Sequence, residues 1–139
     1  AVSVSMSTRP EHSHGGAEDF YDATEARKYT ERSRVVKIQK QLGERALELL
    51  NFPDDGVPRC VLDVGCGSGL SGGVLTEHGH WWVGLDISPD MLSVATEKGV
   101  AGDLLLADMG QGFGFRPGMF DGVISVSALQ WLCYSSKKG

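Results

Sequence analysis

A glycine-rich stretch near the middle of the chain, DVGCGSG at residues 63–69, combines bare backbone with a carboxylate. Gly65, Gly67 and Gly69 alternate directly after the apolar run CVL, and Asp63 lies two positions ahead of the first glycine. Glycine tolerates left-handed backbone and lets a ligand approach the main chain closely. The stretch therefore predicts a loop that contacts a small ligand, although a tight turn between a strand and a helix would need similar residues.

Phosphate-binding loops have a different glycine spacing. The dinucleotide fingerprint is G-x-G-x-x-G, and here Leu70 stands where its third glycine would be. The Lys-Ser/Thr pair of a P-loop is also missing from the stretch. Asp63 would repel a pyrophosphate but would attract an ammonium or sulfonium group. A cationic ligand without phosphates therefore fits this loop better than a nucleotide phosphate does.

Two further acids end apolar runs farther along the chain. Asp86 ends WWVGLD, about twenty residues beyond the loop, where a carboxylate can accept both hydroxyls of a ribose. Asp108 ends DLLLAD, where it can accept a hydrogen bond from the amine of adenine while Met109 covers the ring. A cationic nucleoside satisfies all these positions, so we expect S-adenosylmethionine as the cofactor. Taken singly, Asp86 could instead cap a helix and Asp108 could belong to a turn.

The elements that would position these residues alternate between strands and helices. Apolar runs predict strands at 60–64, 81–86, 103–108 and 120–127, helices at 70–78 and 89–99, and a short helical turn at 128–132. Ser88 would cap the second of these helices, Pro89 would take its first turn and Gly99 would close it. This alternation predicts an α/β, doubly wound, Rossmann-like parallel sheet, with ligands at the carboxyl ends of its strands.

The N-terminal part of the chain should supply a helix ahead of the sheet. Residues 1–18 are rich in Ser, His, Gly and Pro and are expected to be disordered. Residues 19–52 are expected to be helical, with Asp22 and Glu25 at the spacing of a capping box. Helical spacing predicts the apolar face of this segment as Val35, Ile38, Leu42, Ala46 and Leu49. The turn-forming run FPDDGVP should end the segment.

Composition narrows the class of protein. A length of 139 residues allows one domain, and a formal net charge of −5 disfavours a generic polyanion binder. Three cysteines without a C-x-x-C pair form neither a disulfide framework nor a zinc site, and the pairs HSH and HGH lack a third ligand nearby, so no metal is expected. No apolar run is long enough to cross a bilayer, so no membrane partner is expected. Trp81 and Trp82 are expected to be packing residues.

Four motifs, VLDVGCGSGLSG, VGLDISPDML, LLLADMGQG and FDGVISVSALQWL, resemble those of class I S-adenosylmethionine-dependent methyltransferases. The runs RPEH, FYDATEARKY, DMGQG and SALQWLC are similar to those of the eukaryotic small-subunit ribosomal RNA guanine-N7 methyltransferases. That family's sheet has seven strands in the order 3-2-1-4-5-7-6, and about four strands are present in this sequence. Residues 53–139 are therefore expected to be the N-terminal part of an S-adenosylmethionine-binding methyltransferase domain, truncated at its C-terminal side.

The resemblance assigns further site residues. Tyr29 lies on a helix that folds over the cofactor in similar enzymes, so it would cover the methionine end, while Ile87 and Ser125 would join the cofactor site. Trp131 would stack on the target base. Packing against the fourth strand is the alternative for Trp131, and surface packing is the alternative for Tyr29.

The resemblance also implies partners and a place of action. The substrate would be ribosomal RNA of the pre-ribosomal small subunit, in the nucleus (nucleolus and nucleoplasm) and the cytoplasm. A small zinc-binding activator protein would dock at Leu104, Leu105 and Leu106, because the third strand lies at the edge of the family's sheet. Alternatively, flanking helices would already bury these leucines.

Methyl transfer to guanine N7 would need no general base, because this nitrogen carries a lone pair and no proton. The sequence shows no conspicuous acid–base pair near SVSALQWL, which agrees with such a reaction. Two alternatives stay open. One is a ribosome assembly factor in which methylation is dispensable, and the other is a small-molecule carboxyl methyltransferase, since LQW is also typical of the trans-aconitate and malonyl-carrier-protein enzymes.

Overall fold

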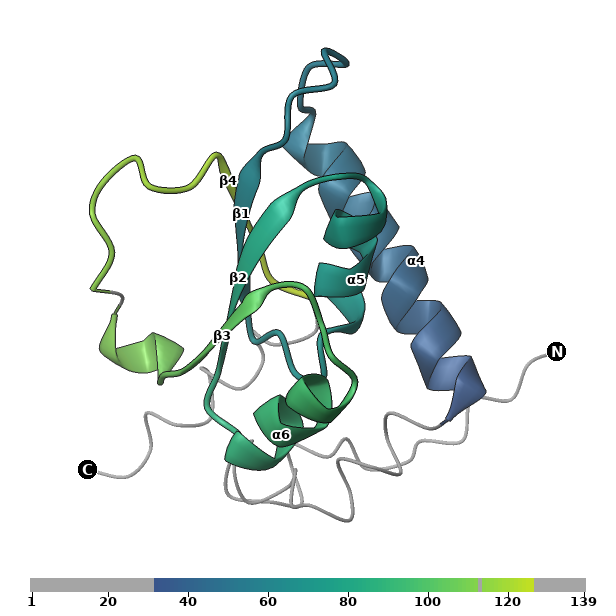
Figure 1. The fold of residues 1–139 in the computed structure, drawn as a ribbon, viewed down its shortest axis with the longest axis vertical. Helices are drawn as coiled ribbons and strands as arrows, with labels where there is room; N and C mark the ends of the chain where they lie inside the picture. Colours follow the sequence, from purple (N-terminus) through teal and green to yellow (C-terminus); the bar gives the residue numbers. More distant parts are fainter. Residues whose placement is uncertain (1–31, 113, 127–139) are drawn as a thin grey trace, which may run out of the picture.

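The computed structural model of the chain describes residues 32–112 and 114–126. The described elements are, in chain order, helix α4 (Ser33–Leu50), strand β1 (Cys60–Val64), helix α5 (Leu70–Glu77), strand β2 (Trp81–Asp86), helix α6 (Pro89–Glu97), strand β3 (Asp103–Leu106), the 3-10 helix η1 (Met109–Gln111) and strand β4 (Gly122–Ile124). The strands pair in parallel in the order β3-β2-β1-β4 (Figure 1). The predicted Rossmann-like alternation is confirmed.

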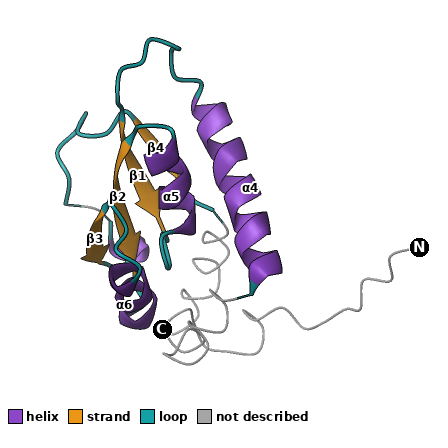
Figure 2. Cartoon of the chain, turned by 45° about the vertical axis from the view of Figure 1, so that its right-hand side comes forward, coloured by secondary structure: helices purple, strands orange, loops and turns teal. Residues whose placement is uncertain are grey.

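The sheet lies between two unequal layers. Helices α4 and α5 cover one face, and the loop that carries η1 lies on the opposite side (Figures 1 and 2). Alternate residues of β1 face opposite ways, so Val61 belongs to the core under the helices while Leu62 belongs to a smaller cluster on the other face. Phe115 and Phe120 close this second cluster with an edge-to-face contact, their ring centroids 4.9 Å apart.

Trp82 is the largest side chain of the core under the helices, and glycines make room for it. A Cβ atom on Gly72 of α5 would lie 2.3 Å from the Trp82 ring, and one on Gly102 would also lie 2.3 Å from it. The indole Nε1 donates a hydrogen bond of 3.0 Å to Oγ1 of Thr76. Trp81 faces the other way and is 72% exposed, so the prediction that both tryptophans pack is wrong for Trp81.

Helix α4 buries a different face from the one that its spacing predicted. Ala46 packs against the core as expected, but Ile38, Leu42 and Leu49 are 44%, 42% and 69% exposed. The reason is the close approach of α4 to α5 at Gly43, where a Cβ atom would lie 3.1 Å from Cγ2 of Val74. That contact turns the helix so that Leu47 and Leu50 enter the core instead. The expected capping box at residues 22–25 lies outside the described residues.

The two outer strands are shorter than predicted. Strand β3 ends at Leu106 rather than at residue 108, and β4 covers residues 122–124 of the expected 120–127. A strand ends where its hydrogen bonds to the neighbouring strand end. Leu106 pairs with Asp86, which is the last residue of β2. Helix α6 begins as expected, because the Ser88 hydroxyl accepts a hydrogen bond of 3.2 Å from the Met91 amide.

Strand β3 forms one edge of the described sheet. Leu104 is half-buried, whereas Leu105 and Leu106 are 43% and 62% exposed. The alternative that flanking helices bury all three leucines is therefore wrong for Leu105 and Leu106. None of the helices in the described residues has the length and hydropathy of a membrane-spanning segment.

Candidate cofactor site

The glycine loop connects β1 to α5 at the carboxyl end of the sheet. The amides of Gly65 and Cys66 both donate to the carbonyl oxygen of Leu85, at 2.7 and 2.9 Å, so the loop is fastened to the end of β2. Gly65, Gly67 and Gly69 all have positive φ, at 75°, 55° and 87°. Residues other than glycine rarely adopt this conformation, so the alternating glycines are a requirement of the backbone path.

Asp86 connects the loop to the next helix. One carboxylate oxygen, Oδ2, accepts a hydrogen bond of 2.8 Å from the Gly67 amide, and Oδ1 accepts one of 2.8 Å from the Ser88 amide. Burial raises the pKa of Asp86, although the backbone hydrogen bonds act in the opposite direction. Each carboxylate oxygen keeps a second lone pair, so Asp86 can still accept hydrogen bonds from hydroxyl groups of a ligand. That contact stays a prediction.

Asp63 lies under the loop with none of its surface exposed. Its Oδ2 accepts a hydrogen bond of 2.6 Å from the Ser71 hydroxyl, while the buried Oδ1 has no partner within the described chain. Burial raises the pKa of Asp63 to about 7, with a smaller contribution in the same direction from Asp86 and an opposing one from the Ser71 hydrogen bond. A charge on Asp63 is therefore costly unless a cation or another donor comes near.

The remaining predicted site residues occupy the same end of the sheet or the loops beyond it. Asp108 does not end a strand but caps η1, where its Oδ1 accepts a hydrogen bond of 2.8 Å from the Gly110 amide. Met109 is half-buried against the cluster on the far face, and Ile87 is half-buried between Asp86 and the cap of α6. The Ser125 hydroxyl donates to the carbonyl oxygen of Val64 at 3.0 Å, which joins the ends of β4 and β1.

Two of the predicted residues, Tyr29 and Trp131, lie outside the described residues. Three residues that the sequence analysis did not single out help to build the site. Ser71 bonds Asp63, Met91 would meet a Cβ atom on Gly67 at 2.9 Å, and Lys98 donates to the carbonyl oxygen of Ser68 at 3.4 Å. Only Ser71 had a signal in the sequence, because a hydroxyl in the first turn after a glycine loop can reach back to the preceding strand.

The arrangement favours a polar ligand that carries positive charge. Two buried or half-buried carboxylates, Asp63 and Asp86, flank a loop that exposes main chain, and no Lys or Arg ion pair to either of them is present within the described residues. In the part of the chain that the structure describes, no group of three or more His, Cys, Asp or Glu side chains is arranged to hold a metal ion.

A parallel sheet of this order, with a glycine loop after β1 and acids after the next two strands, is the Rossmann-like fold of class I methyltransferases. The family model described as a methyltransferase domain matches residues 61–138, and the chain belongs to this family. A Methanococcus maripaludis protein described as an S-adenosyl-L-methionine-dependent methyltransferase has the same fold, with a TM-score of 0.65 at 16% identity over 79% of this chain and 52% of its own.

Two curated relatives are much more similar in sequence. An 18S rRNA (guanine-N(7))-methyltransferase from Arabidopsis thaliana is 64% identical over 95% of this chain and 45% of its own length. One from Mus musculus is 60% identical over 97% of this chain and 47% of its own. The resemblance to the ribosomal RNA guanine-N7 methyltransferases is confirmed, and the chain spans about half the length of the curated relatives it matches.

Proposed function

We propose that this protein transfers a methyl group from S-adenosylmethionine to guanine N7 of small-subunit ribosomal RNA and so takes part in ribosome biogenesis. The observation that carries the proposal is the identity of 64% and 60% with relatives of that name over almost the whole chain. We also propose that it acts in the nucleus and the cytoplasm, and the eukaryotic source of these relatives supports the nuclear part.

The described residues fit S-adenosylmethionine. Asp63 keeps a buried oxygen without a partner, which a cationic ligand nearby would stabilise in its charged form. Gly67 brings bare main chain to the loop surface, where a side chain would be strained by a φ of 55°. When bound, S-adenosylmethionine supplies an electrophilic methyl group on a sulfonium centre.

Most of the residues that would hold this cofactor lie at or just after strand ends. Asp86 would accept the ribose hydroxyls with the lone pairs that the Gly67 and Ser88 amides leave free. Asp108 would accept from the adenine amine, with Ile87 and Met109 on the faces of the ring and Ser125 beside β1. Tyr29 would cover the methionine end.

The protein would contribute to the reaction by positioning the two reactants. Guanine N7 is unprotonated and nucleophilic, so no side chain has to remove a proton before attack. Holding two reactants in line contributes on the order of 7–11 kcal/mol to the lowering of a barrier. Trp131 would hold the target base by stacking, worth about 1–3 kcal/mol.

The exposed edge at β3 supports a second part of the proposal, a small zinc-binding activator protein. Leu105 and Leu106 present apolar side chains beside an edge strand. Such an edge can accept a further strand, and the leucines would be covered at the same time. Replacing Leu105 with Lys should therefore prevent co-purification of the activator, whereas Met119→Lys, at another exposed apolar residue, should not.

The methyl transfer is tested with radiolabelled S-adenosylmethionine and the protein expressed together with the activator. Small-subunit RNA should accept label, and RNA transcribed with 7-deazaguanosine should not, because it lacks the N7 atom. Equal labelling of the two RNAs would contradict the proposed target atom. Labelling of a carboxylic acid such as malonyl-carrier protein in place of RNA would favour the carboxyl methyltransferase alternative.

A further inference from the structure

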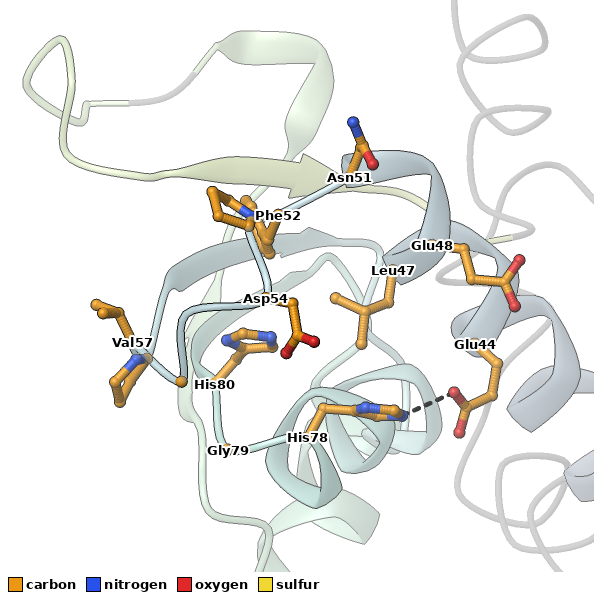
Figure 3. A pocket seen from close by; sticks show the side chains of 13 residues that line it. Glu44, Leu47, Glu48, Asn51, Phe52, Asp54, Val57, His78, Gly79 and His80 are labelled. Carbon is orange, nitrogen blue, oxygen red and sulfur yellow. Dashed lines mark hydrogen bonds and ion pairs between the residues drawn. The ribbon is translucent and has the colours of Figure 1, made fainter.

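A pocket lies at the opposite end of the sheet from the glycine loop. Its volume is about 510 Å³, and it is formed by the C-terminal half of α4, by residues 52–58 that lead into β1 and by residues 78–80 that lead into β2 (Figure 3). Volumes of roughly 300–1,000 Å³ are typical of ligand pockets. Since these segments precede the strands, the pocket lies at their amino ends and shares no residue with the candidate cofactor site.

Carboxylates dominate the charge of this pocket. Glu44, Glu48 and Asp54 all line it. Glu44 lies 2.8 Å from Nε2 of His78, and Glu48 lies 2.7 Å from Arg45. Within the described residues Asp54 makes no hydrogen bond or ion pair, and its carboxylate points into the pocket beside the His80 ring (Figure 3). The Asp54 carboxylate is therefore available to pair with a cation that enters the pocket.

The Arg59 side chain, five residues along the chain from Asp54, is bound to other groups. The Arg59 guanidinium lies 2.7 Å from Asp55 and donates to the carbonyl oxygen of Val57 at 3.1 Å. Its side chain is only 17% exposed, so it is held against the loop. Arg59 consequently does not neutralise Asp54.

The floor of the pocket is apolar and aromatic. Phe52 and His80 form an edge-to-face pair with ring centroids 5.4 Å apart, and Leu47 lines the side toward α4. Nδ1 of His80 accepts a hydrogen bond of 3.1 Å from the Arg59 amide, so the ring proton is on Nε2. Burial also lowers the pKa of His80, which favours a neutral ring at pH 7. A flat cation can stack on such a ring.

We propose that this pocket binds an arginine side chain of a basic segment of a partner protein, with the guanidinium stacked at His80 and paired with Asp54 and Glu44. Arginine fits better than lysine because its planar fork can bond two carboxylates and stack at once, whereas an ammonium is a compact, strongly hydrated charge. Free arginine fits less well, since its own α-carboxylate would meet the acidic rim. The proposal is independent of the proposed methyl transfer, because the pocket shares no residue with the cofactor site.

The test uses a fluorescein-labelled Gly-Arg repeat peptide with three arginines, and a Gly-Lys peptide of the same length and charge. Binding to the full chain is measured by anisotropy at fixed ionic strength. We expect the arginine peptide to bind more tightly, and Asp54→Asn to weaken it about fivefold, the upper range for an exposed ion pair. Asp103→Asn is the matched control, since this exposed residue begins β3 at the same end of the sheet. It should change the affinity less than about twofold.

Three results would overturn the proposal. They are no binding of the arginine peptide, equal affinity for the lysine peptide or spermidine, and equal weakening by Asp54→Asn and Asp103→Asn. Circular dichroism melting checks that each variant is folded. Glu44→Gln serves as a second variant, and it should weaken the arginine peptide more than the lysine peptide.

Discussion

The two ends of the sheet use the same residue type in opposite ways. At the carboxyl end, Asp63 and Asp86 are drawn into the protein, and burial raises the pKa of both. At the amino end, Asp55 is exposed beside Arg59, and hydrogen bonds from the Val57 amide and from Arg59 lower its pKa. At the carboxyl end, the charged forms of Asp63 and Asp86 would gain from an incoming cation, whereas at the amino end the charged form of Asp55 is already stabilised. Burial, not residue identity, makes the difference.

The largest expected effect is a pH dependence of stability that arises from Asp63. Its pKa is 3.8 when unperturbed and about 7 in the folded chain, so the folded state binds the extra proton between these values. Stability should therefore be highest near pH 4, fall as the pH rises toward 7 and level off above, by on the order of 4 kcal/mol at most. Urea unfolding from pH 4 to 8 measures this slope. Asp63→Asn should reduce this slope and leave the contribution of Asp86, whose pKa burial also raises. An unchanged slope in this variant would place its origin elsewhere.

Close packing of α5 on β2 should give the next largest effect, because it holds the carboxyl-end loop in place. Gly72→Ala puts a Cβ atom 2.3 Å from the rigid Trp82 ring and should destabilise the chain by about 3 kcal/mol. Gly73→Ala on the same helix meets nothing within 4 Å and should instead stabilise by up to about 1 kcal/mol, through helix propensity. Thermal unfolding of the two variants compares them directly. Similar losses of stability in the two variants would mean that the Trp82 ring moves aside in Gly72→Ala.

Cofactor affinity should separate the two ends of the sheet. Asp86→Ala removes a charged acceptor that also bonds the Gly67 amide at 2.8 Å, so S-adenosylhomocysteine should bind about tenfold more weakly or worse. Asp54→Ala at the amino end should leave this affinity unchanged. Calorimetry measures the dissociation constants of both variants, and NAD should produce no heat of binding with either of them. Unchanged affinity in Asp86→Ala would remove the proposed ribose contact.

The smallest effect should come from Asp55, and its sign should be opposite to that of Asp63. The pKa of Asp55 is lowered in the folded chain, so its contribution is present above pH 4 and is lost as the pH falls through the folded pKa. Exposure to solvent and salt keeps the contribution small. Asp55→Asn should slightly reduce stability at pH 7 and leave it unaltered at low pH. An equal loss at both pH values would point to the turn itself, not to charge.

The sequence alone determined the features that depend on local spacing. The order of strands and helices, the alternating glycines between β1 and α5, and the Ser88–Pro89 start of α6 all follow from periodicity, positive φ and capping chemistry. These rules act within a few residues, so they can be read without knowing what the chain packs against. The family resemblance was likewise recognisable from motifs of this kind.

Only the tertiary structure decided the features that depend on which distant surfaces meet. The contact at Gly43 determines which face of α4 is buried. Gly72 and Gly102 leave room for the Trp82 ring, which is buried, whereas Trp81 is exposed. The hydrogen bond from the Gly67 amide to Asp86 joins two segments that the spacing of residues could not pair. Periodicity predicts a helix or a strand but not what that element packs against. Burial, which raises the pKa of Asp63 and Asp86, depends on these packing partners.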